Sequence, residues 1–270
     1  MRMADARTRA RLGALMQRVL IVGGQPAANK SLGERLRDVG PCQIWSATVL
    51  ADGLGLAGRI DPKLILVDQS SSLDAAEFVR SLRRGDLSCR QAPLILVSAN
   101  ATAAAIVAAR DAGAHEFLRR PFTIEALARH LDAAAGRPRD WIEGMSYVGP
   151  DRRRFNTGDY SELLRRRVEY AARSDDARMV QALKIIEAAM LALETDPRQA
   201  LRAMRAQADE IASLAKAHAD HALWTAAEKI GHALAVRDAP LGRAGAAMLI
   251  GPLLEQLGAV APAAARRSAA

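Results

Sequence analysis

The sequence predicts an α/β domain followed by an all-α region, and three observations carry that prediction. Between residues 18 and 135, short apolar runs alternate with amphipathic segments. Two of these runs, the Leu-Ile-Leu-Val segments at 64–67 and 94–97, are apolar throughout, which is typical of parallel strands buried on both faces. From residue 160 onward, helix-forming residues dominate. We therefore expect a doubly wound, five-stranded parallel sheet and a C-terminal all-α bundle.

Five apolar runs are the expected strands. In chain order they are Val-Leu-Ile-Val from residue 19, Gln-Ile-Trp-Ser-Ala-Thr from 43, Lys-Leu-Ile-Leu-Val-Asp from 63, Ala-Pro-Leu-Ile-Leu-Val-Ser from 92 and His-Glu-Phe-Leu-Arg-Arg from 115. Helical segments are expected between them. Phe78, Val79 and Leu82 share one face of such a segment, and Gly113 stands where a helix C-cap is expected.

Composition changes mark the other parts of the chain. Residues 136–159 mix Gly, Pro, Arg and aromatic residues without a clear period, which indicates a connector that is either a linker or an extension packed on the first domain. Asp196 before Pro197 predicts the start of a helix, with Asp as N-cap and Pro in the first turn. The expected parts are a basic N-terminal arm (1–17, disordered or helical), the α/β domain (18–135), the connector (136–159), the helical bundle (160–258) and a disordered tail (259–270).

The composition is that of a globular protein with an excess of basic residues. Of 270 residues, 50% are hydrophobic, and the formal net charge is +8. Two explanations of this positive charge are open. Either the protein binds phosphates or acidic surfaces, or its sequence is generally enriched in arginine. Cys42 and Cys89 form neither a disulfide framework nor a metal-ligand spacing. No apolar run approaches the roughly 20 residues of a membrane span, and no signal peptide is evident, so we expect a cytoplasmic protein.

The residues that follow the predicted strands form a candidate site. The carboxyl ends of parallel strands meet at one edge of the sheet, where ligands bind in such folds. Gly23 and Gly24 follow the first strand, Asp68 the third and Ser98 the fourth. The fifth strand leads into an Arg-Arg-Pro-Phe segment that contains Arg120.

This pattern resembles the receiver domain of bacterial two-component response regulators, over residues 18 to 135. The resemblance implies the flavodoxin-like strand order and places Asp68 at the phosphoacceptor position. It also implies that Ser98 fills the position of the hydroxyl that contacts the phosphoryl group, and Phe117 that of the aromatic switch residue. The function it implies is regulatory rather than enzymatic, with a histidine kinase or a downstream signalling protein as partner.

Several residues depart from the family pattern. Gly23 and Gly24 replace the two acids that hold Mg²⁺, and Arg120 replaces the lysine before the proline of the last strand. The loop after Asp68 also lacks the usual Met-Pro and is one residue short. Mg²⁺ prefers several oxygen ligands, so a single carboxylate should hold it weakly or not at all. Arginine is always charged and favours paired contacts with carboxylates, so it could lock Asp68 in a salt bridge.

We therefore expect a phosphorylation-independent pseudo-receiver that acts through protein–protein contacts. An alternative is a response regulator that is phosphorylated on Asp68 despite these changes. The helical bundle is expected to be a dimerisation or partner-docking module, with a homodimer as one possibility. DNA binding is not expected, because the basic residues of the helical half alternate with acids and no helix-turn-helix pattern is present.

The connector contains a second candidate site. A Gly-Pro-Asp turn is followed by Arg152, Arg153 and Arg154, and the aromatic residues Tyr147 and Phe155 flank this segment. Guanidinium groups pair with phosphates and stack on planar rings. The segment is similar to arginine-rich tails that follow receiver domains, some of which bind cyclic di-GMP. A cyclic di-GMP-responsive effector is therefore a second alternative, beside a plain linker whose arginines pair with nearby acids.

Overall fold

The computed structural model describes residues 12–70, 72–136, 139–152, 155–156, 175–235, 242 and 244–255. Residues 1–11 of the expected N-terminal arm, Arg153, Arg154 and the expected tail lie outside this range. The chain divides into two compact units. One contains Met1–Ile142 and Tyr147–Tyr170, and the other contains Glu143–Ser146 and Ala171–Ala270.

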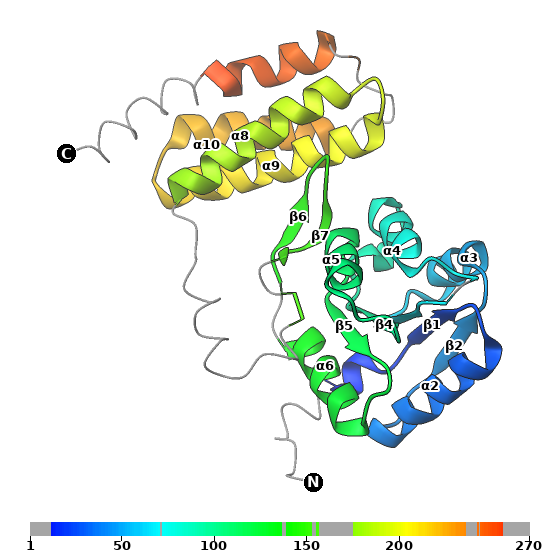
Figure 1. Ribbon diagram of the computed structural model, residues 1–270. Helices are drawn as coiled ribbons and strands as arrows, with labels where there is room; N and C mark the ends of the chain where they lie inside the picture. Colours follow the sequence, from blue (N-terminus) through cyan, green and yellow to red (C-terminus); the bar gives the residue numbers. More distant parts are fainter. Residues whose placement is uncertain are drawn as a thin grey trace. The chain divides into compact units, whose positions relative to one another are not determined.

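A five-stranded parallel sheet lies at the centre of the first unit (Figure 1). Its strand order is β2-β1-β3-β4-β5, which confirms the doubly wound α/β prediction. Every residue of β1, β3 and β4 is buried, as continuous apolar runs require when helices cover both faces. The strands are β1 (Val19–Gly23), β2 (Ile44–Ala47), β3 (Leu64–Asp68), β4 (Leu94–Ser98) and β5 (Glu116–Arg119).

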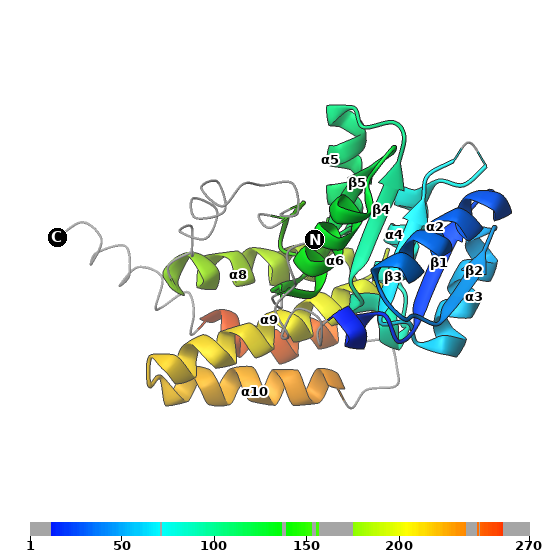
Figure 2. The ribbon, with the colours of Figure 1, turned by 90° about the horizontal axis from the view of Figure 1, so that it is seen from below.

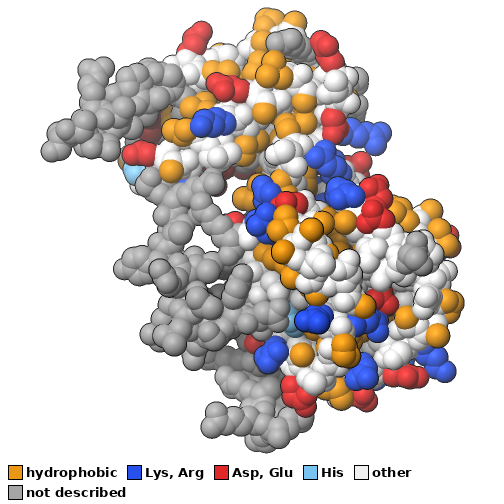
Figure 3. All heavy atoms as spheres, in the orientation of Figure 1, with side chains coloured by type: hydrophobic (Ala, Val, Ile, Leu, Met, Phe, Trp, Pro, Cys, Tyr) orange, Lys and Arg blue, Asp and Glu red, His pale blue; other side chains and the backbone are white. Residues whose placement is uncertain are grey.

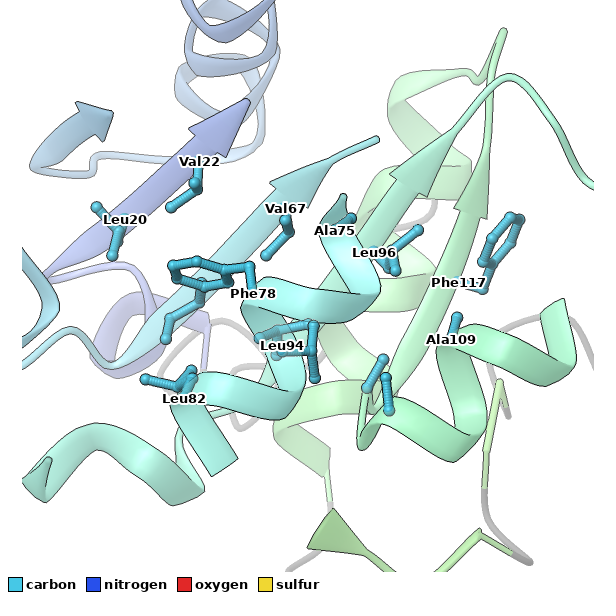
Figure 4. Packing of buried hydrophobic residues seen from close by; sticks show 14 of the residues in the cluster. Leu20, Val22, Val67, Ala75, Phe78, Leu82, Leu94, Leu96, Ala109 and Phe117 are labelled. Atoms are coloured by element: carbon cyan, nitrogen blue, oxygen red, sulfur yellow. The ribbon is translucent and has the colours of Figure 1, made fainter. Parts of the chain in front are cut away.

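Helices cover the two faces of the sheet and enclose two hydrophobic cores (Figure 1). Because side chains alternate along a strand, Leu20 and Val22 enter one core while Val19 and Ile21 enter the other. Figure 4 shows the first of these cores, in which Phe78 packs against the sheet. The helices are α2 (Pro26–Val39) and α6 (Ile124–Gly136) on one face, and α3 (Leu50–Ile60), α4 (Ala75–Arg84) and α5 (Ala103–Ala112) on the other.

Two predicted helix ends are confirmed. Gly113 ends α5 in the left-handed conformation, with φ of 104°, and its N–H bonds to the carbonyl of Ala109. Asp196 caps the start of α9 (Pro197–Ala217), where its side chain accepts a hydrogen bond from the Gln199 N–H at 3.2 Å. Local residue chemistry therefore sets both boundaries.

The connector forms a short β-hairpin, β6 (Trp141–Glu143) and β7 (Val148–Pro150), that the sequence pattern did not predict. Within the first unit, Asn156 pairs with the outer edge of β5. Its side-chain oxygen accepts the N–H of Phe117 at 2.8 Å, and its own N–H donates to the carbonyl of His115 at 3.2 Å. Phe155 is buried in the core beside them. The connector thus shields an edge strand that would otherwise expose unpaired backbone groups.

A fully buried arginine joins several segments of the first unit. Arg83 donates hydrogen bonds to the carbonyls of Gly113 and Ala92, both at 3.0 Å, and to that of Arg90. Its other nitrogen lies 3.2 Å from Nδ1 of His115. Burial lowers the pKa of Arg83 to about 9 and holds the pKa of His115 well below its usual value. The ring of Trp141 lies 5.4 Å from the guanidinium carbon of Arg83, which ties the connector to this cluster.

The second unit contains α8 (Asp175–Ala192), α9, α10 (His221–Ala235) and a further helix over residues 244–255, as the all-α prediction requires. Figure 2 shows the first three of these helices side by side, with α9 between the other two. Gln199 is buried and donates to Oε1 of Glu143 at 3.0 Å and to the carbonyl of Gly144 at 3.1 Å. The turn of the hairpin is thus held within this unit. None of the described helices is long and apolar enough to cross a bilayer.

Candidate functional site

Asp68 lies at the carboxyl end of β3, where the sequence analysis places the site. It pairs in register with Gly23 on β1 and with Val97 on β4. Its side chain is only 10% exposed. The guanidinium of Arg120 engages both carboxylate oxygens, with Nε 3.2 Å from Oδ1 and a terminal nitrogen 2.9 Å from Oδ2. The expected salt bridge is therefore present, and it has the paired geometry that gives the strongest Arg–carboxylate contacts.

Arg120 is held in place by its neighbours after β5. Its backbone N–H donates to the carbonyl of Ser98 at 2.8 Å, and the Arg120–Pro121 peptide is cis. The ring of Phe122 lies 5.7 Å from the guanidinium carbon of Arg120 and 5.8 Å from that of Arg35. Because a guanidinium over an aromatic face is favourable, Phe122 supports the orientation of Arg120 toward Asp68.

The Asp68 carboxyl is subject to two opposing influences. Burial raises the pKa of Asp68, and the positive charge and hydrogen bonds of Arg120 offset part of that rise. Removing a carboxylate from water costs free energy unless a partner compensates for the lost hydration. Arg120 is that partner, so the pair behaves as one unit.

At the first of the two expected metal positions, Gly23 is closely surrounded. A Cβ atom on Gly23 would lie 2.3 Å from Oδ1 of Asn29 and 2.9 Å from Cβ of Asp68. Asn29 is buried, and its Nδ2 donates to the carbonyls of Gly23 at 3.0 Å and of Ala47 at 3.1 Å. No side chain larger than hydrogen fits at residue 23 without movement of these groups.

The second metal position, Gly24, lies under the loop that follows β3. A Cβ atom there would lie 2.0 Å from Oγ of Ser72 and 2.4 Å from Oγ of Ser70. Gln69 organises this loop: its side-chain amide donates to the carbonyls of Ser70 and Leu73, and its oxygen accepts the N–H that begins α4. The serine hydroxyls therefore occupy the space beside Gly24.

These residues do not fit Mg²⁺. The ion requires near-octahedral oxygen ligation, usually with carboxylates among its protein ligands. Asp68 is the one carboxylate of the expected set, and both of its oxygens are engaged by Arg120. In the part of the chain that the structure describes, no group of three His, Cys, Asp or Glu side chains is arranged to hold a metal.

Ser98 lies on β4, next to the strand that carries Asp68, and Phe117 lies on β5, one strand further out. Ser98 ends β4, is buried, and accepts the N–H of Asn100 at 3.1 Å through its hydroxyl. Phe117 points into the core from β5, near Ala109 of α5 (Figure 4), and is 2% exposed. The structure thus brings Asp68, Arg120 and Gly23 together, whereas Phe117 is buried in the first core.

Tyr147 and Arg152, the described members of the arginine-rich candidate site, lie within the first unit. The guanidinium carbon of Arg152 lies 4.3 Å from the Tyr147 ring, and a terminal nitrogen lies 3.0 Å from Oδ1 of Asp111. Tyr147 is buried and donates to the carbonyl of Pro150 at 2.6 Å. Burial raises the pKa of Tyr147 to about 12. Cyclic dinucleotide binding at this segment stays a prediction.

Three residues of the site were not identified from the sequence: Asn29, Gln69 and Phe122. A buried asparagine near the start of a helix and a glutamine after a strand carry no pattern of their own. Phe122 stands within the Arg-Arg-Pro-Phe segment, but its role depends on where the Arg120 side chain points. Only the assembled strand ends reveal what these residues contact.

Comparison with known proteins agrees with this architecture. The profile of the response regulator receiver domain matches residues 19–132. Over 123 residues the chain is 34% identical to the KDP operon transcriptional regulatory protein KdpE of Escherichia coli, covering 45% of this chain and 52% of that protein. Over 131 residues it is 29% identical to the transcriptional regulatory protein PdtaR of Mycobacterium tuberculosis, covering 47% and 60%. It thus spans little more than half the length of these relatives.

Three further matches cover most of the chain with which they are compared. The chain is 28% identical over 120 residues to the probable chemotaxis protein CheY of Rhizobium etli, covering 92% of that protein. Among solved structures, Vibrio cholerae CheY4 matches with 21% identity and a TM-score of 0.41, covering 44% of this chain and 98% of that one. The receiver domain of a Pseudomonas aeruginosa sensor histidine kinase matches with 25% identity, a TM-score of 0.40 and coverage of 45% and 98%. The family match identifies residues 19–132 of this chain as a response regulator receiver domain.

Proposed function

We propose that this protein is a phosphorylation-independent regulator in two-component signalling, whose receiver domain acts through protein–protein contacts in the cytoplasm. The observation that supports this most directly is the paired contact between Arg120 and both oxygens of Asp68. Here each oxygen accepts a hydrogen bond from a permanent cation, which lowers the nucleophilicity of the carboxylate toward a phosphoryl donor. Asp68 then serves as one half of a standing salt bridge.

The metal positions support the same proposal. Phosphoryl transfer depends mostly on positioning and on neutralising charge on the transferred oxygens, which Mg²⁺ provides in many enzymes. Gly23 and Gly24 offer no ligand, and the space beside them is filled by Asn29 and by serine hydroxyls. Without the ion, the acceptor reaction loses a large part of its electrostatic assistance.

Intact-mass analysis tests the proposal. The full chain is incubated with acetyl phosphate and Mg²⁺ beside an Asp68→Asn control. The expected result is no mass increase in either protein. A Mg²⁺-dependent gain of one phosphoryl group in the wild type, absent in the control, would overturn the proposal and favour a response regulator phosphorylated on Asp68.

The proposal also requires that the protein binds other proteins. The helical unit is the expected docking or dimerisation module, and a histidine kinase or downstream signalling protein is the expected partner class. The dimer is tested by light scattering of the full chain over a range of concentrations.

The cyclic di-GMP alternative is tested by titrating the wild type and Arg152→Ala/Arg153→Ala with cyclic di-GMP. Equally weak binding to both proteins would contradict this alternative.

A further inference from the structure

The two glycines at the metal positions differ in what surrounds them. Beside Gly24 the nearest atoms are hydroxyls of Ser70 and Ser72. Ser72 is exposed and Ser70 is half-buried, so both hydroxyls can rotate away. Beside Gly23 the nearest atoms are Oδ1 of Asn29 and Cβ of Asp68, and both of these residues are buried. The two positions should therefore respond differently to the same substitution.

Asn29 is held rigidly against Gly23. Its Nδ2 bridges two carbonyls, that of Gly23 at the end of β1 and that of Ala47 at the end of β2. These bonds fix the orientation of the amide, so Oδ1 must face the other way, toward the Gly23 Cα and Asp68. Oδ1 has no hydrogen-bond partner among the described residues. Leaving a buried acceptor without a partner costs free energy. The two hydrogen bonds that Nδ2 donates therefore hold the Asn29 amide in this orientation.

We propose that Asn29 closes the metal position of this receiver domain and that Gly23 is glycine because Asn29 occupies the space of a side chain there. The glycine at residue 23 and the asparagine at residue 29 are thus energetically coupled. Adding a carboxylate at residue 23 is then insufficient to restore a cation site, because its first carbon would lie 2.3 Å from the asparagine oxygen. The inference rests on the proposed function only in treating the site as one that excludes Mg²⁺.

A double-substitution cycle on the full chain tests the coupling. The variants are Gly23→Ala, Asn29→Ala and the two combined, with Gly24→Ala as the matched glycine control. Gly23→Ala is expected to lower Tm by about 5 °C or more, and Gly24→Ala by clearly less. The combined variant should melt above the Tm obtained by adding the two single effects, because removing the amide makes room for the new methyl group.

A cation titration tests the functional consequence. Gly23→Asp/Gly24→Asp/Arg120→Lys is prepared with Asn29 intact, with Asn29→Ala, and with Gln25→Ala as the matched control at an exposed position of the same segment. Calorimetric titration with Mg²⁺ should show binding about tenfold tighter in the Asn29→Ala background than in the other two. Equal affinity in all three would overturn the inference. If the acidic variants fail to fold, the Tm values of the Gly23→Ala and Asn29→Ala variants and of their combination test the inference.

The outcomes separate this inference from the proposed function. Strictly additive effects of Gly23→Ala and Asn29→Ala on Tm would overturn the coupling and leave phosphorylation independence untouched. Labelling of the wild type by acetyl phosphate would overturn phosphorylation independence, while non-additive Tm values would still support the contact between residues 23 and 29.

Discussion

Arg120 and Asp68, 52 residues apart in the chain, meet through two hydrogen bonds of 3.2 and 2.9 Å at the end of the parallel sheet. Asp68 is buried, and this burial raises the pKa of its carboxyl group while Arg120 offsets part of the effect. The charge of Arg120 is therefore a stabilising partner for an acid that the fold has largely removed from water. Four predictions follow from this pair and from the other buried polar contacts of the receiver domain.

Replacing Arg120 by methionine should destabilise the protein at neutral pH more than at acidic pH. The pKa of Asp68 is raised in the folded state, so ionisation costs folding free energy, and without Arg120 that cost increases. As the pH falls toward and below the ordinary aspartate pKa of about 3.9, the carboxyl becomes protonated in both states and the cost disappears. The expected loss is about 2 kcal/mol at pH 7.5 and clearly less at pH 4.

Urea unfolding at the two pH values measures this effect. Arg119→Met is the matched control, because Arg119 is exposed at the end of β5. A loss for Arg120→Met that is the same at both pH values would contradict the role assigned to the pair.

Replacing the buried Arg83 by methionine should cost about 3 kcal/mol of unfolding free energy. The change leaves carbonyls of Gly113 and Ala92 without their donor. Chemical unfolding measures the loss, and Arg80→Met is the control, since Arg80 makes only exposed ion pairs on the same helix. Equal stabilities of the two variants would show that the Arg83 hydrogen bonds contribute little.

His115 should make the wild type lose stability as the pH falls from 7 to 5. The folded state holds the pKa of His115 far below 6.5, so only the unfolded state takes up a proton in this range. Relative to His115→Asn, the wild type should lose about 2 kcal/mol between these pH values. Unfolding curves at pH 7 and 5 measure the difference, with the exposed His232→Asn as control. A parallel pH dependence of wild type and His115→Asn would refute the prediction.

Asn156→Ala should release the connector from the edge of β5. The variant loses the acceptor of the Phe117 N–H, so the amide of Phe117 should exchange with solvent faster and stability should fall by about 1 kcal/mol. Hydrogen exchange read by mass spectrometry on peptides covering β5 is the measurement. Asn100→Ala is the control and should leave β5 unchanged, because the Asn100 side chain is exposed and accepts the N–H of Thr102 at 3.4 Å.

Much of the receiver fold was predictable because burial on both faces leaves a simple pattern. The Leu-Ile-Leu-Val runs at 64–67 and 94–97 became the buried strands β3 and β4. The helix ends at Gly113 and Asp196 followed from local chemistry, since a left-handed residue and a side-chain cap each involve only nearby backbone. The β6–β7 hairpin was not predictable, because its strands are three residues each and show no alternation.

The candidate site was also predictable from the sequence only in part. By itself the sequence determined that an acid, two glycines and an arginine follow successive strands, because topology brings the ends of parallel strands to one edge. Only the tertiary structure decided that Arg120 engages both oxygens of Asp68 and that Asn29 fills the space beside Gly23. A side chain's partners depend on which distant backbone and side-chain atoms lie within about 3 Å, and sequence spacing does not encode that distance.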